Sequence, residues 1–351
     1  MAKKRNLPSL NEIAREINIS ASTISRVLNG KPGIAEATRQ TVLSALHERG
    51  YPKKPIQGGV QTLRNGSSTI AFAITSKIRE RIANGDPFYG RHLLALQTAC
   101  AQKGYYPILV DYEQDTTPDG GLRCVDEHRV YGVVAEDMPE PMIEKLRSRI
   151  GIVLLNIVRP IPQVDYVIPD VRQAAREQVQ FLYDLGHRSI ACFRPLPVGF
   201  GGWQTHFYWS EFWWMHKKLQ LDLPDEFFAP IQFSAHGEEV AAEEFMERVM
   251  SSSSPPTAIV TSDNYAGIIM NQCKKRKLRI PKDISLMGYD DRRYLSGAAN
   301  LSTYRQNFEG MAREALRLLV DRCENLNLSG RIVEIEGTLI HRDTVAPPPH
   351  C

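Results

Sequence analysis

One face of a helix predicted over residues 21–29 carries the side chains that could contact a nucleic acid: Ala21, Ser22, Ser25, Arg26 and Asn29. The opposite face is apolar, with Ile24, Val27 and Leu28 at helical spacing. Such a helix can bury its apolar side in a small core and turn its polar side toward a groove of a duplex. The chemistry expected here is hydrogen bonding to nucleic acid rather than catalysis.

Two further helices must hold that face in place. Ser9 and Glu12 have the S-x-x-E spacing of a capping box at the start of the first helix. The apolar residues of this helix follow at i, i+3, i+4 and i+7 and form one stripe: Leu10, Ile13, Ala14 and Ile17. Asn18 tolerates the left-handed conformation that ends a helix, and Ser20 is a good N-cap for the helix that follows.

A third amphipathic segment, residues 36–49, offers Val42, Ala45 and Leu46 to the same core. Three helices in about 50 residues, two of them joined by a tight turn, are typical of a helix-turn-helix module.

The charge distribution agrees with this interpretation. Residues 1–66 contain 11 Lys/Arg and 4 Asp/Glu, a net charge of +7; the whole chain carries +3, so residues 67–351 carry −4. A basic head on a mildly acidic body is expected of a duplex-binding protein, because phosphate contacts supply most nonspecific affinity. The alternative, a solvated basic tail, is disfavoured by the regular helical periodicity.

The segment Ile19-Ser-Ala-Ser-Thr-Ile-Ser-Arg-Val-Leu-Asn29 resembles the signature V-S-x-x-T-V-S-R-V-L-N of the LacI/GalR family of transcriptional regulators. Further blocks keep the family order: Ala37-Thr38-Arg39, Val42, Gly50-Tyr51, residues 185–191 (LGHRSIA), 256–259 (PTAI), 280–291 (IPKDISLMGYDD) and 302–306 (STYRQ). The blocks span about residues 9–345. The resemblance implies a sequence-specific DNA-binding regulator, expected to be a repressor, whose operator affinity a small ligand modulates.

The resemblance also implies roles for residues of the head. Ala21, Ser22 and Arg26 match positions that face base edges in the major groove. Arg26 is the best candidate for direct readout, because a guanidinium can pair with O6 and N7 of guanine and discriminate by roughly 1–3 kcal/mol; a phosphate contact alone is the alternative. The other residues assigned to the DNA-binding surface are Ser9, Leu10, Ser20, Thr23, Ser25 and Asn29.

The linker, residues 52–67, departs from the family pattern. Family members follow Gly-Tyr with a hinge helix, R-P-N-x-x-A-x-x-L, whose leucine enters the minor groove. The stretch here is about two residues longer and contains Gly58-Gly59, a poor helix interior. Ile56 or Val60 could supply the apolar wedge of a hinge that kinks DNA, and a plain flexible linker is an equal alternative.

The body, residues 68–345, alternates strand-like and helical patterns, which predicts parallel βαβ units. The expected strands are residues 70–75, 107–111, 131–135, 152–156, 189–193, 258–262 and 284–289, and the expected helices include 91–103, 174–185, 238–250 and 265–277. About 280 residues are many for one layer stack and favour two subdomains.

The expected fold class is therefore α/β, with a three-helix helix-turn-helix head. The resemblance implies a two-subdomain core like that of periplasmic binding proteins, with chain crossovers near residues 162–168, 290–296 and 320–326. The expected divisions are a head (1–51), a hinge or linker (52–67), an effector-binding and dimerisation domain (68–345) and a disordered tail (346–351).

An effector is expected between the two subdomains, near the carboxyl ends of strands. Asp263 falls where the family pattern N-D-x-x-A places a ligand carboxylate, which can accept hydrogen bonds from two sugar hydroxyls; capping of a helix is the alternative. Phe88 and Tyr89 match the N-P-F-F block at the cleft edge. Asp290 ends another strand near the cleft, where stabilisation of a turn is an equally good role.

Residues 203–214 hold all four tryptophans, where the family usually places R-x-x-G-[FY], whose arginine often binds the effector. No arginine occurs between Arg194 and the end of this cluster. Aromatic faces can stack on sugars, so Trp209 is a candidate for effector binding, although core packing is the more common role for any one of these aromatic residues.

Several other classes of protein are disfavoured. The six cysteines show no C-x-x-C or Cys/His ligand spacing, so no metal and no cofactor are expected. No apolar run of about 18 residues and no signal-peptide core occur, so the chain is expected to be cytoplasmic and not to bind a membrane, and to associate with the nucleoid when bound to DNA. We expect it not to be an enzyme, because no catalytic acid/base pair or nucleophile constellation is visible.

The expected partners are double-stranded DNA with a pseudo-palindromic operator, a second copy of the chain, and a small-molecule effector, a sugar or related metabolite. The homodimer is expected because helix-turn-helix heads pair on two half-sites. Closure of the subdomains on a ligand would shift the spacing of the heads and couple the two sites. An α/β enzyme or a sugar-binding protein with an incidental basic head is the alternative, and it would need a catalytic constellation or a signal peptide.

Overall fold

The computed structural model describes residues 10–28, 34–35, 38, 41–42, 44–46, 49, 68–127, 129–155, 160–194, 203–228, 237–292 and 300–349. The predicted linker and the DNA-binding candidates Ser9, Asn29, Ile56 and Val60 lie outside these residues. In the head, helices α1 (Leu10–Glu16) and α2 (Ala21–Leu28) occupy the two predicted positions. Described residues 38, 41–42 and 44–46 of the third predicted helix are also helical.

The first subdomain of the body is built on a six-stranded parallel sheet with the order β10-β5-β4-β3-β1-β2. Its strands are β1 (Thr69–Ile74), β2 (Tyr106–Asp111), β3 (Gly132–Ala135), β4 (Gly151–Leu154), β5 (Asp165–Pro169) and β10 (Ile332–Ile335). One face packs on α4 (Ser76–Ala83), α5 (Pro87–Lys103) and α13 (Phe308–Glu324). The other face packs on α6 (Arg123–Asp126) and α7 (Glu140–Leu146).

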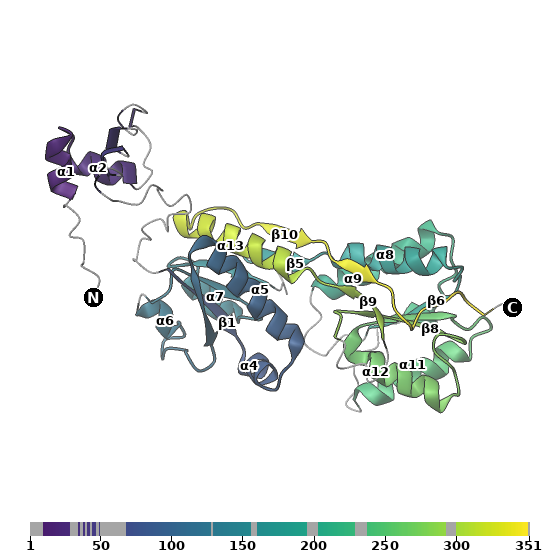
Figure 1. The fold of residues 1–351 in the computed structure, drawn as a ribbon. Coiled ribbons are helices and arrows are strands. Elements are labelled where there is room, and N and C mark those ends of the chain that lie inside the picture. Colours follow the sequence, from purple (N-terminus) through teal and green to yellow (C-terminus); the bar gives the residue numbers. More distant parts are fainter. Residues whose placement is uncertain are drawn as a thin grey trace, which may run out of the picture.

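The second subdomain is built on a five-stranded sheet with the order β11-β9-β8-β7-β6. Its strands are β6 (Ile190–Phe193), β7 (Ala258–Thr261), β8 (Ser285–Tyr289), β9 (Ser302–Arg305) and β11 (Thr338–Ile340), of which β11 is antiparallel. Helices α8 (Val171–Asp184) and α9 (Trp203–Lys218) cover one face, and α10 (Asp225–Phe228), α11 (Glu238–Met250) and α12 (Asp263–Lys275) cover the other (Figure 1).

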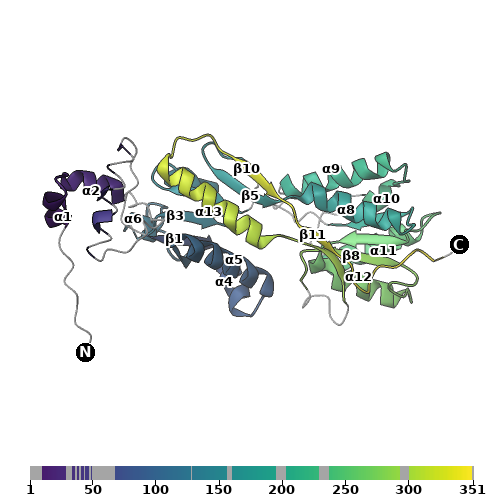
Figure 2. The ribbon, with the colours of Figure 1, turned by 45° about the horizontal axis from the view of Figure 1, so that its top comes forward.

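The predicted alternation of strands and helices is confirmed, and each predicted strand and helix of the body is present with ends shifted by a few residues. The pattern missed β5, β9, β10 and β11. Of these strands, β10 and β11 lie in a C-terminal segment that joins one sheet and then the other (Figure 2).

The chain passes between the two sheets three times, later than predicted. The crossings lie at residue 170, at residues 306–307 and at residues 336–337, rather than near 162–168, 290–296 and 320–326. The predicted positions were wrong because β5 still pairs within the first sheet, β9 still pairs with β8, and residues 320–324 lie in α13, which packs on β3, β4 and β5.

The C-terminal segment is held against the second subdomain where the structure describes it, although a disordered tail was predicted from residue 346. His187 Nε2 lies 2.9 Å from the carbonyl oxygen of Ala346, and the amide of Ala346 donates to Ser285 Oγ at 3.1 Å. The tail prediction was therefore wrong at Ala346, whose backbone groups both have partners.

No helix of the described residues is long and apolar enough to cross a bilayer. No group of three or more His, Cys, Asp or Glu side chains in the same part of the chain is placed to hold a metal ion.

Candidate functional site

The turn between α1 and α2 closes as the sequence predicted. Asn18 has a φ of 53°, in the left-handed region. The amide of Ile19 donates to the carbonyl of Ala14 at 3.0 Å, and the amide of Asn18 donates to the carbonyl of Arg15 at 3.4 Å. This pair of hydrogen bonds is the Schellman pattern, which satisfies the last carbonyl groups of α1 and sets the direction of the chain into α2.

Ser20 caps α2. Its Oγ accepts a hydrogen bond from the amide of Thr23 at 3.0 Å and lies 2.8 Å from both the Thr23 and the Ser22 hydroxyl oxygens. The hydroxyls of Ser20, Ser22 and Thr23 therefore contact one another in the first turn of α2, and the Ser22 side chain is exposed.

The apolar side of α2 is buried in the head's own core, as predicted. Ile24 and Val27 of α2 pack there, with exposed fractions of 0% and 2%. The other buried members of this core are Ile13, Ala14, Val42 and Leu46. Ala21 departs from its predicted place on the outer face, because it is only partly exposed and packs against this core. It lies three residues before Ile24, a spacing that places both on one side of a helix.

A second group of predicted residues meets between the two subdomains. The guanidinium of Arg292 lies over the ring of Phe88 at 3.7 Å and over that of Tyr89 at 5.6 Å. Its Nη1 is 3.4 Å from Asp86 Oδ2, and its Nε is 3.6 Å from Asp290 Oδ2. The start of α5 in the first subdomain and the loop after β8 in the second thus face each other across this cluster.

Asp263, the first residue of α12, is buried beside the same cluster. Its carboxylate accepts hydrogen bonds from the amide of Arg292 at 2.5 Å and from Thr303 Oγ1 at 2.9 Å. The N-cap of α12 is Ser262, so Asp263 does not cap the helix as the alternative supposed. Burial, and then the neighbouring Asp290 carboxylate, raise the pKa of Asp263 to about 7.

This raised pKa gives a prediction for stability. The pKa of Asp263 is about 7 in the folded chain and about 3.9 for an unperturbed Asp, so the folded state holds the proton more tightly. Stability should therefore fall as the pH rises from about 4 to about 7. Denaturant titration at pH 5, 6, 7 and 8 measures the unfolding free energy of the native chain and of Asp263→Asn. The value for the variant minus the value for the native chain should increase as the pH rises.

Asp343→Asn is the matched control, because that carboxylate bonds Asn300 at the surface. It should keep the pH dependence of the native chain. A difference between the native chain and Asp263→Asn that stays constant with pH would contradict the prediction.

Asp290 lies at the end of β8 with a φ of 108°, outside the usual range of a residue with a side chain. Its Oδ1 accepts a hydrogen bond from Gln306 Nε2 at 2.6 Å, and burial raises its pKa. Asp290 thus shapes the turn and also faces the cleft cluster through Arg292, and its part in effector binding stays a prediction.

Arg91 makes another link between the subdomains. From α5 its Nη2 donates to the carbonyl oxygen of Asp291 at 2.8 Å and to that of Asp290 at 3.4 Å. Neither Arg91 nor Arg292 was predicted, because their partners lie about 200 residues away in sequence and only the folded chain brings them together.

Arg194 was also missed as a site residue. It directly follows β6, and its guanidinium lies over the rings of Tyr208 at 3.9 Å and Tyr289 at 4.7 Å. The rule that selected Asp263 and Asp290, a polar residue at the carboxyl end of a parallel strand, would have selected Arg194 as well.

Trp209 lies in the core of the second subdomain, with 6% of its surface exposed and its ring edge-on to Phe212. This placement corresponds to the core alternative and not to an exposed stacking face for a sugar. Among the aromatic side chains of α9 that the structure describes, Trp213 and Trp214 are exposed, and Lys217 and Lys218 lie over their rings.

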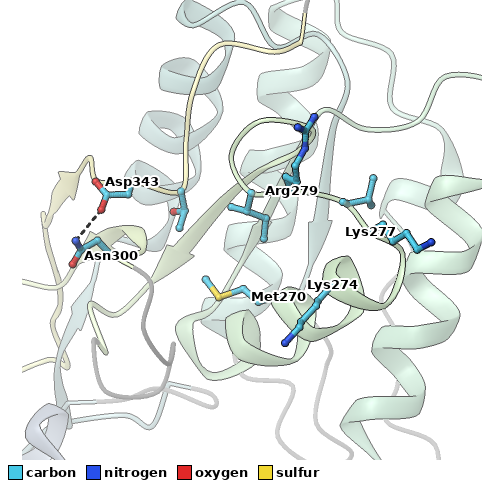
Figure 3. A pocket seen from close by; sticks show the side chains of 9 residues that line it. Met270, Lys274, Lys277, Arg279, Asn300 and Asp343 are labelled. Carbon is cyan, nitrogen blue, oxygen red and sulfur yellow. Dashed lines mark hydrogen bonds between the residues drawn. The ribbon is translucent and has the colours of Figure 1, made fainter.

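A surface pocket of about 490 Å³ lies elsewhere on the second subdomain (Figure 3). Its lining includes Lys274 and Lys277, which point away from each other, and Arg279, which is already paired with Asp283 at 2.7 Å. None of the predicted effector residues lines this pocket.

Three family models match the chain, and two of the matches overlap at residues 179–197. Residues 9–53 match the description "Bacterial regulatory proteins, lacI family", residues 82–197 match "Periplasmic binding proteins and sugar binding domain of LacI family", and residues 179–345 match "Periplasmic binding protein-like domain". The first lies on the head and the start of the linker, and the other two together span most of the body.

Whole-length similarities agree with the models. The HTH-type transcriptional repressor PurR of Vibrio vulnificus is 26% identical over 97% of this chain and 99% of its own length. The complex of the transcriptional regulator CelR with cellobiose has a TM-score of 0.63, 22% identity, and coverage of 96% and 99%. The lac repressor dimer bound to operator and the anti-inducer ONPF has a TM-score of 0.56, 19% identity, and coverage of 97% and 100%. These two solved structures share the fold of this chain.

Proposed function

Because this chain belongs to the LacI/GalR family of transcriptional regulators, we propose that it acts as a homodimer on a pseudo-palindromic operator and responds to a sugar or a related metabolite. The chain is a DNA-binding repressor whose activity a small-molecule effector modulates. A repressor binds its operator on the chromosome, so we propose a cytoplasmic location. We also propose that the chain has no catalytic activity.

The observation that carries the effector proposal is the meeting of Phe88 and Tyr89 with Asp290 and Arg292 across the two subdomains. Aromatic faces and carboxylates are the groups that bind the apolar faces and the hydroxyls of sugars. The similar CelR structure contains cellobiose, which supports a sugar as the effector here. A ligand that touches both subdomains would stabilise one relative arrangement of them.

Selection of bound duplexes from a random pool tests the proposal. The full chain should enrich one pseudo-palindromic sequence, and the enrichment should change when a sugar or related metabolite is added. Failure to enrich any sequence at moderate ionic strength would refute operator recognition. Enrichment that no member of a broad sugar panel alters would refute the effector class.

Arg26→Ala tests which residue reads the operator. The variant should lose preference at one symmetric base pair, because a bidentate arginine–guanine contact contributes roughly 1–3 kcal/mol of discrimination, and it should keep weak, salt-sensitive binding. The selection above, repeated with the variant, measures the preference. Arg15→Ala, which removes an exposed charge from α1, is the control and should leave the preferred sequence unchanged. An unchanged preference in Arg26→Ala would show that another residue reads that base pair.

The homodimer is supported by an exposed apolar surface on the first subdomain. Strand β2 is the edge of its sheet, and Tyr106 on it is 69% exposed. Leu94 on α5 is 62% exposed, and Ile108 and Leu109 are each 38% exposed. An apolar sheet edge invites pairing with another chain, and a second copy would cover it.

Leu94→Glu tests this dimer surface. A buried charge at the interface should raise the dimer dissociation constant roughly tenfold or more, because the carboxylate would lose its water, and sedimentation equilibrium measures that constant. Trp213→Glu is the control, since Trp213 is 47% exposed on the other subdomain. Equal dissociation constants for the native chain and Leu94→Glu would place the interface elsewhere.

A further inference from the structure

Three polar residues stand in one row across the sheet of the second subdomain. Phe193 pairs with Thr261, so Arg194 and Ser262 are the next residues of β6 and β7 in register. Val260 pairs with Met287, and Tyr289 lies two residues further along β8, level with Ser262. Because the strands are parallel, the three residues lie side by side at the carboxyl edge.

The row faces the side of the sheet that α8 and α9 cover. Side chains two residues apart on a strand point to the same face. The residues two positions before the row are Cys192, Val260 and Met287, and all three belong to the core beneath α8 and α9, as does Tyr208. This placement agrees with the contact between the Arg194 guanidinium and the ring of Tyr208 at 3.9 Å.

Each member of the row has a buried polar atom without a partner. Arg194 Nη1, Ser262 Oγ and the Tyr289 hydroxyl are all inaccessible to solvent and make no hydrogen bond. Arg194 forms no ion pair with a described carboxylate, and the oxygens of the nearby Asp290 are directed to Gln306 and Arg292. A buried guanidinium nitrogen and two buried hydroxyls without hydrogen-bond partners destabilise the fold unless another group completes them.

We infer that Arg194, Ser262 and Tyr289 form a subsite for the oxyanion of the effector, a carboxylate or a phosphate. All three groups donate hydrogen bonds, and a planar guanidinium is suited to both of these anions. This inference rests on the proposed function, because the row borders the cleft cluster through Asp290. The effector is then a sugar acid or a sugar phosphate, with hydroxyls toward the carboxylates of the cleft and its charge toward Arg194.

Matched triplets of a neutral sugar, its acid and its phosphate test the subsite on the full chain. Glucose, glucuronate and glucose 6-phosphate form one triplet, and ribose, ribonate and ribose 5-phosphate form another. Titration calorimetry measures the dissociation constant of each compound. The charged member of one triplet should bind the native chain roughly 10- to 100-fold tighter than its neutral partner. Whether the acid or the phosphate binds more tightly identifies the anion.

Arg194→Gln should reduce that difference to less than about threefold, and Lys275→Gln, which removes an exposed charge from the same subdomain, should preserve it. Should Arg194→Gln fail to fold, Arg194→Lys and Tyr289→Phe test the subsite instead. Arg194→Lys keeps the charge and removes only the planar guanidinium group, and Tyr289→Phe keeps the ring and removes only the hydroxyl. Each should weaken the charged ligand and leave the neutral one unchanged.

A second measurement separates this inference from the proposed function. Inorganic phosphate or acetate should raise the unfolding temperature of the native chain in a saturable way, and not that of Arg194→Gln. If no sugar binds but this effect is present, the sugar proposal fails and the subsite stands. If the neutral sugars bind as tightly as their charged partners, or if native chain and Arg194→Gln respond alike to both anions, the subsite is refuted.

Discussion

Replacing Ile24 by alanine is expected to abolish selective operator binding. Ile24 is completely buried in the core of the head, among Ile13, Val27, Val42 and Leu46. Loss of a buried isoleucine to alanine costs about 2–5 kcal/mol, whereas a domain of this size has a net stability of only a few kcal/mol. The head should therefore unfold, and affinity for the selected operator should fall to the nonspecific level, roughly 1,000-fold or more lower.

Fluorescence anisotropy with the operator found by selection measures this loss. Ser44→Ala is the matched control, because Ser44 is an exposed residue of the third helical segment of the head, lies outside the predicted DNA-binding surface, and its change leaves the core intact. Effector binding to the body should be the same in both variants and in the native chain. Operator affinity in Ile24→Ala within tenfold of native would mean that this core does not hold the recognition helix.

Replacing Asp165 by alanine is expected to cause the largest loss of stability in the body. Asp165 is fully buried at the start of β5, and Arg322 of α13, 1% exposed, donates to it at 2.7 and 3.0 Å. Arg331 donates to the same carboxylate from its amide and side chain at 2.9 to 3.1 Å. Removing one partner of a buried ion pair costs about 3–5 kcal/mol, because the remaining charge is buried without compensation.

The same group sets a pH dependence. Burial by itself raises the pKa of Asp165, but the hydrogen bonds from Arg331 and Arg322 outweigh it and hold the pKa below its ordinary value. Its contribution to stability is therefore present above about pH 4, the ordinary value of an aspartate, and is lost as the pH falls further. Asp165→Ala should lack this contribution and unfold at a lower denaturant concentration at neutral pH.

Glu144→Ala is the control for Asp165→Ala. Glu144 pairs with Arg147 at the surface of the same subdomain, at 2.7 Å, and exposed pairs contribute at most about 1 kcal/mol. Urea titration of both variants at neutral pH measures the two costs. A loss in Asp165→Ala no larger than that in Glu144→Ala would show that the two arginines find other partners.

Local sequence patterns predicted the parts of the fold that local interactions determine. The stripe from Leu10 to Ile17, the left-handed Asn18 and the cap at Ser20 are properties of short segments, and the structure places the helices and turn accordingly. Strands β1, β3, β4, β6, β7 and β8 of the body were found for the same reason, because parallel strands buried on both faces are continuous apolar runs.

The positions of the crossings and the arginines of the cleft depend on contacts between distant segments. Arg292 is a cleft residue because its guanidinium meets Phe88 and Asp86, about 200 residues earlier in the chain. Periodicity contains no information about such pairs. Asp263 was placed in the right region, but its hydrogen bonds to Arg292 and Thr303 could be seen only in the folded chain.

The threading of the chain through both sheets has a consequence for biosynthesis. The first sheet lacks its edge strand β10, and the second lacks β11, until residues 332–340 have left the ribosome. Domains usually fold one after another as they are translated, but these two halves can reach their final form only together, at the end of synthesis. A stop codon before residue 332 therefore leaves both halves unfinished, and no truncated product retains one intact half of the sensor.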